Sequence, residues 1–105
     1  MEKNLKEKAI QIKGKAYVQV SHRIIFFNET YKEGCIITEM LSPVEGEHII
    51  IKATVYPEGL NGRKFVGHSQ ATIGDGMVNK TSALENAETS AVGRALALMG
   101  IGVID

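Results

Sequence analysis

The residues of this 105-residue chain that are most suggestive of a binding site are its basic side chains. They are spread along the chain and are Lys13, Lys15, Arg23, Lys52, Arg63, Lys64, Lys80 and Arg94. Two aromatic residues, Tyr17 and Tyr31, stand near some of them in the sequence. Positive charge that follows a phosphate backbone, beside rings that stack on bases, holds single-stranded nucleic acid without reading its sequence. Soluble domains of any function also carry spread charge, so composition alone favours an ordinary solvated surface.

No catalytic constellation emerges from the other reactive residues. His22, His48 and His68 fall on different predicted elements, and a hydrolase would need His68 to converge with Cys35 and Glu88. The single cysteine excludes an intrachain disulfide and a thiolate zinc site. The glycines do not form a Walker-type phosphate loop. We therefore expect a protein that is not an enzyme and needs no cofactor and no metal.

The totals indicate one modest domain, residues 1–105, with residues 1–13 as a candidate N-terminal arm and residues 14–105 as the core. Twelve Lys and Arg balance twelve Asp and Glu, so the formal net charge is zero. A nucleic-acid site must then be a local patch, or a groove that oligomerisation repeats. No apolar run reaches membrane-spanning length and no signal peptide is visible, so we expect a cytoplasmic protein without a membrane partner.

The element that must position these residues is a long helix predicted over Ser82–Met99. Ser82 and Glu85 have the spacing of a capping box at its start. One face is apolar, and the opposite face is small rather than charged; its residues are Asn86, Thr89, Ser90, Gly93 and Ala97. The small face predicts a close contact, either with a strand or loop of the same chain, which the helix alone favours, or with another subunit or a nucleic-acid backbone. Glu88 is expected on the apolar face of this helix. Because a carboxylate among apolar side chains needs a partner, we expect it to form an ion pair.

Spacing predicts a second helix over residues 17–31, although its β-branched and aromatic content also fits a strand. Three strand-like runs follow at residues 35–41, 48–56 and 64–73. Their short connections predict an antiparallel meander with helices on one face. The expected fold is α+β: a helix, a three-stranded antiparallel β-meander and a long C-terminal helix packed on the sheet.

The order of short motifs resembles the Rad fifty-two-like annealing superfamily, and most closely its phage single-strand annealing and single-stranded DNA-binding proteins of the Sak and ERF types. The motifs cover residues 17–102. They are Tyr17-Val18, His22-Arg23-Ile24-Ile25, Asn28-Glu29, Tyr31 and Gly34, then Gly67-His68-Ser69, Lys80, Leu84-Glu85-Asn86-Ala87, Thr89 to Leu96 and Met99-Gly100.

This resemblance implies a protein that binds single-stranded DNA without sequence preference and anneals complementary strands in phage recombination or replication, in the host cytoplasm. It implies a homo-oligomeric ring or filament, with contacts to other recombination or replication proteins. By position it assigns Tyr17, Arg23, Lys80 and Arg94 to the DNA groove. The full set of candidate DNA contacts is Lys13, Lys15, Tyr17, Arg23, Lys52, Lys64, Lys80 and Arg94.

The alternative is an assembly or partner-binding module that kept this fold and lost annealing. Gly93 stands where the superfamily has a lysine before the arginine that Arg94 matches, and the net charge is zero. Both features favour the alternative.

Overall fold

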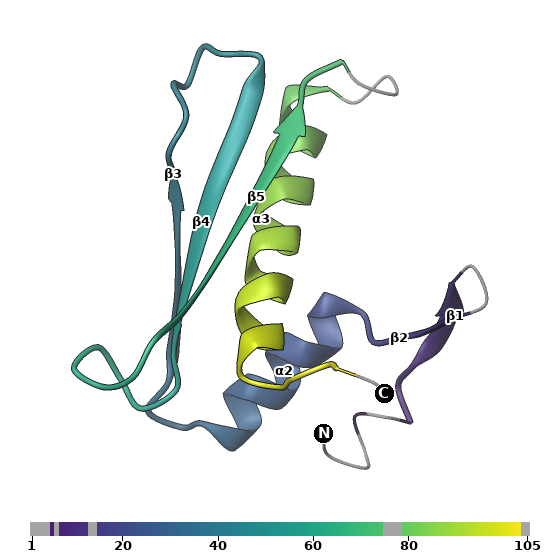
Figure 1. Cartoon of the computed structure of the whole chain (residues 1–105), viewed down its shortest axis with the longest axis vertical. Coiled ribbons are helices and arrows are strands. Elements are labelled where there is room, and N and C mark those ends of the chain that lie inside the picture. Colours follow the sequence, from purple (N-terminus) through teal and green to yellow (C-terminus); the bar gives the residue numbers. More distant parts are fainter. Residues whose placement is uncertain (1–4, 6, 13–14, 75–78, 104–105) are drawn as a thin grey trace.

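The computed structural model describes residues 5, 7–12, 15–74 and 79–103, and Figure 1 shows their arrangement. The element order is β1 (Ile10–Ile12), β2 (Lys15–Tyr17), α2 (Val20–Thr30), β3 (Cys35–Met40), β4 (His48–Tyr56), β5 (Phe65–Thr72) and α3 (Lys80–Leu98). From α2 onward the chain runs helix, three strands, long helix. The α+β fold predicted from the sequence is therefore confirmed.

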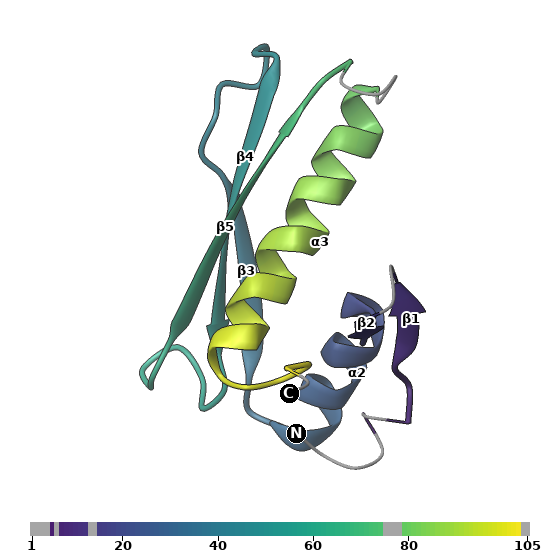
Figure 2. The same cartoon turned by 45° about the vertical axis from the view of Figure 1, so that its right-hand side comes forward.

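The main sheet has the order β3-β4-β5, and both strand pairs are antiparallel. Alternate residues of β4 are buried toward one face, as expected for a strand with one covered side. These residues are Ile49, Ile51, Ala53 and Val55. The same register places Lys52 opposite His68 on the other face, which no described element covers in Figure 2.

Helix α3 covers the buried face of the sheet and packs mainly on β4 and β5. Its buried side is a column of small residues at four-residue spacing, Ala83, Ala87, Ala91 and Ala95. The column brings the helix backbone close to β5. A Cβ atom at Gly67 would lie 2.5 Å from the Ala91 oxygen and 2.6 Å from the Ala95 nitrogen. Only glycine fits at this crossing, because backbone atoms on the helix cannot move aside as a flexible side chain can.

The start of α3 differs from the sequence prediction. The helix begins at Lys80, and Asn79 is its N-cap: the Ser82 backbone N–H donates to Asn79 Oδ1 at 2.8 Å. The predicted capping box of Ser82 and Glu85 is therefore wrong, because Ser82 already lies inside the first turn. The sequence pattern also places Leu98 in the apolar face of this helix, which is wrong, since Leu98 is 64% exposed.

The segment before α2 corrects the predicted helix over residues 17–31. Helix α2 begins at Val20, and Tyr17 lies in β2, where it pairs with Ile10 of β1. The two short strands form an antiparallel hairpin. Their backbone N–H and C=O groups are therefore paired between strands rather than within a helix. Figure 1 places this hairpin beside α2, away from the main sheet.

Helix α2 packs beside the C-terminal half of α3, as the two views in Figures 1 and 2 agree. Phe27 and Val20 anchor α2 in the core. Gly93 of α3 lies under α2, where an added Cβ would meet Val20 Cγ2 at 2.9 Å. The small face of α3 is therefore partly an intrachain contact, as favoured from the sequence, but its partner is helix α2 rather than a strand or loop. Across the described ranges, no helix combines the length and apolarity that crossing a membrane requires.

Candidate nucleic-acid interface

The charges of this neutral chain are separated between the two edges of the sheet. Residues 59–74, which contain β5 and most of the turn before it, carry Arg63, Lys64 and His68 and no Asp or Glu, while Glu58 stands near the start of that turn. Residues 28–47, which contain β3 and its flanking turns, carry one Lys and a series of carboxylates: Glu29, Glu33, Glu39, Glu45 and Glu47. Because β3 and β5 are the outer strands, the sheet has a basic edge at β5 and an acidic edge at β3.

Helix α3 extends this separation through two side chains that lie at opposite sheet edges. Arg94 Nη1 donates to the His68 backbone oxygen at 3.0 Å, next to β5. On the other side, the Thr38 hydroxyl of β3 donates to Glu88 Oε2 at 2.7 Å. Glu88 is exposed, so its predicted place in the apolar stripe is wrong, and within the described ranges its recorded partner is a hydroxyl rather than a cation. We call the surface formed by Arg63, Lys64, His68 and Arg94 the basic edge.

A groove of about 270 Å³ lies between α2 and α3, next to the basic edge. Arg94, Thr89 and Ser90 are its exposed polar residues, and Gly93 and Ala97 keep its floor low. Of the described residues that line the groove, none is acidic. The groove therefore offers an exposed guanidinium and two hydroxyls to a phosphate or a sugar hydroxyl. The small face of α3 is thus shared between a contact with α2 and this open groove.

Arg23, a predicted DNA contact, lies at the bottom of the same groove with only 9% of its surface exposed. Its Nε donates to the Val18 oxygen at 2.8 Å, and its Nη1 donates to the Gly93 oxygen at 3.4 Å. These bonds join the chain before α2 to the middle of α3. The guanidinium has a clear structural role, and its contact with nucleic acid stays a prediction.

The other predicted contacts are dispersed. Lys13 lies outside the described residues, and Lys15 and Tyr17 belong to β2. Lys52 lies on the uncovered sheet face, paired with His68 of β5, and Lys64 is exposed just before β5. Lys80 is exposed at the start of α3, about 21 Å along the helix from Arg94. The fold thus brings Lys52, Lys64 and Arg94 around β5, and it places Lys80 at the far end of α3.

The end of the molecule that carries Lys80 is not a basic surface. In Figure 1 the turn between β3 and β4 lies at the same end as the start of α3. This turn carries two exposed carboxylates, Glu45 and Glu47, and they offset the positive charge of Lys80. A polyanion is therefore better placed along β5 than across this end.

Sequence reasoning left Arg63, His68, Thr89 and Ser90 out of the candidate contacts. The guanidinium of Arg63 lies 4.8 Å from the centre of the Phe65 ring, a cation–π contact at the start of β5. The signal that could have found the basic edge was the absence of acidic residues over 59–74, rather than any motif. Thr89 and Ser90 were recognised as small residues, but their place in a groove depends on α2.

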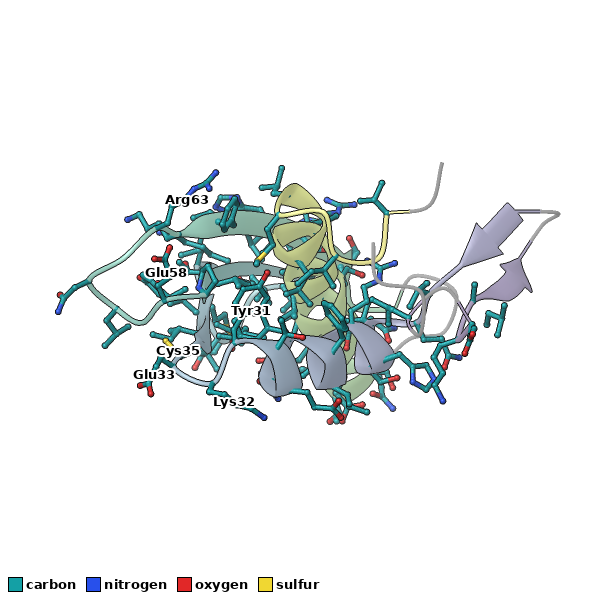
Figure 3. The ribbon with its side chains drawn as sticks, turned by 90° about the horizontal axis from the view of Figure 1, so that it is seen from below. Tyr31, Lys32, Glu33, Cys35, Glu58 and Arg63 are labelled. Atoms are coloured by element: carbon teal, nitrogen blue, oxygen red, sulfur yellow. The ribbon has the colours of Figure 1, made fainter. Side chains whose placement is uncertain are left out.

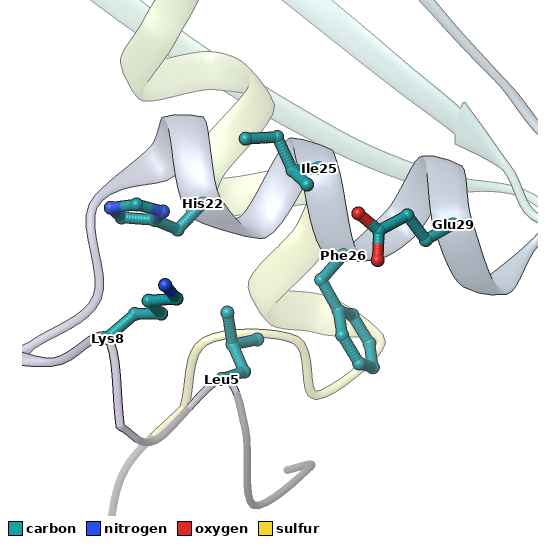
Figure 4. Close-up of a pocket in the computed structure, with 6 residues that line it drawn as sticks. All are labelled: Leu5, Lys8, His22, Ile25, Phe26 and Glu29. Carbon is teal, nitrogen blue, oxygen red and sulfur yellow. The ribbon is translucent and has the colours of Figure 1, made fainter.

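A second cavity, of about 290 Å³, lies on the other side of α2 against the N-terminal segment (Figure 4). Figure 4 shows Lys8 and His22 facing each other across it, with Leu5 and Phe26 as apolar walls and Glu29 at one side. The lining of this cavity includes a carboxylate, Glu29, whereas the groove between α2 and α3 has no acidic lining residue among those described. Among the described residues, no three His, Cys, Asp or Glu side chains gather where they could hold a metal ion.

The comparison with known families corrects the resemblance inferred from the sequence. A family model described as "Slr1353 N-terminal dsRNA-binding domain-like" matches residues 24–99, from the first turns of α2 to the end of α3. No curated protein matches the chain. The assignment to Rad fifty-two-like annealing proteins is therefore wrong: its short motifs follow a helix, three strands and a helix, an order that does not distinguish the two families. Because the match covers most of the chain, the protein belongs to the Slr1353 N-terminal dsRNA-binding domain-like family.

Proposed function

We propose that this domain binds double-stranded nucleic acid, with double-stranded RNA as the preferred ligand, and that the basic edge and the adjoining groove form the contact surface. The observation that carries the proposal is the charge separation between the sheet edges: residues 59–74, which include β5, contain no Asp or Glu. The name of the family supports the choice of duplex RNA.

The chemistry of the surface suits a duplex that is recognised by shape. A-form RNA presents phosphates and 2′-hydroxyls across a wide, shallow minor groove, and proteins contact these groups rather than the base edges. Arg94 can pair with a phosphate, while Thr89 and Ser90 can donate to or accept from a 2′-hydroxyl. None of these contacts reads a base, so binding is expected to be independent of sequence. The proposed function of the domain is binding alone, without a catalytic reaction.

A binding panel with the full chain tests the proposal. Fluorescence anisotropy would compare a labelled RNA duplex of about 16 base pairs with the DNA duplex of the same sequence and with single strands of both. The expected order is duplex RNA first, with affinity that falls as salt increases because phosphate contacts release counterions. Single-stranded DNA is the ligand that the sequence analysis predicted, so its affinity is the main comparison. Tighter binding of single-stranded DNA than of duplex RNA would refute the preference.

Self-association is a second candidate, and the same charge separation favours it. The basic edge of one copy is complementary to the acidic edge of another, a head-to-tail arrangement that would give the ring or filament expected from the sequence. Sedimentation velocity at low and high salt would test this. Because both uses involve β5, duplex RNA should dissociate such an assembly rather than stabilise it.

A further inference from the structure

A cavity of about 390 Å³ lies at the end of the molecule where β5 begins and α3 ends. Its volume is in the range of small-molecule sites. Figure 3 looks onto this end of the molecule. Arg63 lies at one margin, Lys32 and Glu33 lie at the opposite margin, and Glu58 and Tyr31 lie between them. Arg63, Glu58 and Tyr31 line the cavity, so it adjoins the basic edge at Arg63.

The walls of this cavity are aromatic and apolar. Phe65 and Tyr31 supply rings, and Met99 and Leu98 supply flexible apolar surface from the last turn of α3. Leu98 is 64% exposed although it lies on a helix whose other large aliphatic side chains are at least partly buried. Packing within the described chain does not explain this exposure, and a flat ligand seated in the cavity would cover it.

Two oppositely charged side chains line the same cavity, and no ion pair joins them in the part of the chain that the structure describes. The Arg63 guanidinium lies over the Phe65 ring, with its central carbon 4.8 Å from the ring centre. The Glu58 carboxylate is exposed. The site therefore combines a planar cation for stacking with an oxygen acceptor.

We infer that this cavity takes one unpaired base next to a bound duplex, an inference that rests on the proposed function. Unpaired bases stack on aromatic rings and on arginine planes, and they expose hydrogen-bonding edges that paired bases do not. Glu58 can accept a hydrogen bond from an exocyclic amine, which adenine, cytosine and guanine carry and uracil lacks. The ring N3–H of uracil lies between two carbonyl oxygens, which a carboxylate repels, so it is a poorer donor to Glu58. The cavity therefore favours an unpaired A, C or G over U.

The position of the cavity supports a base rather than an apolar side chain from another protein. Arg63 belongs both to the cavity and to the basic edge, so a strand that leaves a duplex on β5 would reach it directly. An apolar side chain would use the walls but would leave Glu58 and Arg63 without a role.

The test uses the full chain and RNA duplexes of about 16 base pairs. One duplex is blunt, and four others carry a single unpaired 3′ A, C, G or U. Anisotropy titrations would compare the wild type with Glu58→Ala and with Glu33→Ala. Both variants remove one exposed carboxylate at the same end of the molecule, and only Glu58 lines the cavity. Circular dichroism would verify that both variants are folded.

The expected result is binding of an amine-bearing overhang about tenfold tighter than of the blunt duplex, a gain of about 1.4 kcal/mol that is within the range for stacking one base. The preference over uracil should persist in Glu33→Ala and disappear in Glu58→Ala. Equal affinity for all five duplexes would overturn the base site and leave duplex binding intact. Failure of the blunt duplex to bind would refute the proposed function itself. A preference over uracil that survives in Glu58→Ala would overturn the role of Glu58.

Discussion

Arg94 of α3 donates from Nη1 to the backbone oxygen of His68, so the guanidinium lies against the outer edge of β5. An exposed strand edge invites pairing with other strands, and a charged side chain laid against it opposes such pairing. The same guanidinium also lines the groove between α2 and α3. Only one of its five N–H groups takes part in the bond with His68 in the described structure, so it retains donors for a phosphate.

Gly67→Ala should destabilise the fold, because the added Cβ would meet backbone atoms of Ala91 and Ala95 on α3. We expect a loss of about 2 kcal/mol and a fall in Tm of about 10 °C, as for overpacking in a small domain. Thermal unfolding by circular dichroism checks it. Gly46→Ala is the matched control, since its Cβ would have 3.6 Å to the nearest atom, the Pro43 oxygen. Equal Tm values for the two variants would contradict the close crossing of α3 and β5.

Arg23→Ala should lower the free energy of unfolding by about 2 kcal/mol, because the buried guanidinium donates to the Val18 and Gly93 oxygens. Urea denaturation measures this loss. Arg94→Ala removes an exposed arginine of the same groove and should change stability by no more than about 0.5 kcal/mol. If Arg23→Ala were as stable as the wild type and only lost affinity for RNA, Arg23 would be a contact residue rather than a link between the helices.

Asn79→Ala should destabilise α3 by about 1 kcal/mol, because the side chain that accepts the Ser82 backbone N–H is lost. Ser82→Ala keeps that backbone donor and should have a smaller effect. Chemical denaturation of both variants decides between the observed cap and the one expected from the sequence. A larger loss in Ser82→Ala would restore Ser82 as the cap.

The main sheet and the long helix could be predicted from the sequence, but the N-terminal hairpin could not. Alternating apolar residues in β4 and the strong helix formers of α3 specify their elements locally, and both were predicted close to their observed bounds. Tyr17 was wrongly assigned to the following helix, because the strand over residues 15–17 exists only through pairing with residues 10–12. Local preference contains no such partner.

The candidate site depends even more on tertiary structure. Arg23 and Arg94 look alike in the sequence, as two arginines on helices, yet one is buried in backbone contacts and the other is exposed. The groove beside Thr89 and Ser90 exists because Gly93 lets α2 approach α3. The net charge of zero gave no indication of the basic edge, because a sum over the chain does not report that opposite charges lie near β3 and β5.

The most direct test of duplex binding at the basic edge compares two variants that change the net charge equally. Arg94→Gln removes a cation from the basic edge, and Lys32→Gln removes an exposed cation from the chain next to the acidic edge. Affinity for an RNA duplex of about 16 base pairs would be titrated at several salt concentrations. The account predicts about tenfold weaker binding for Arg94→Gln, equivalent to about 1.4 kcal/mol, with a salt slope smaller by about one. Lys32→Gln should keep wild-type affinity. Equal weakening in both variants, or none in Arg94→Gln, would contradict binding at the basic edge.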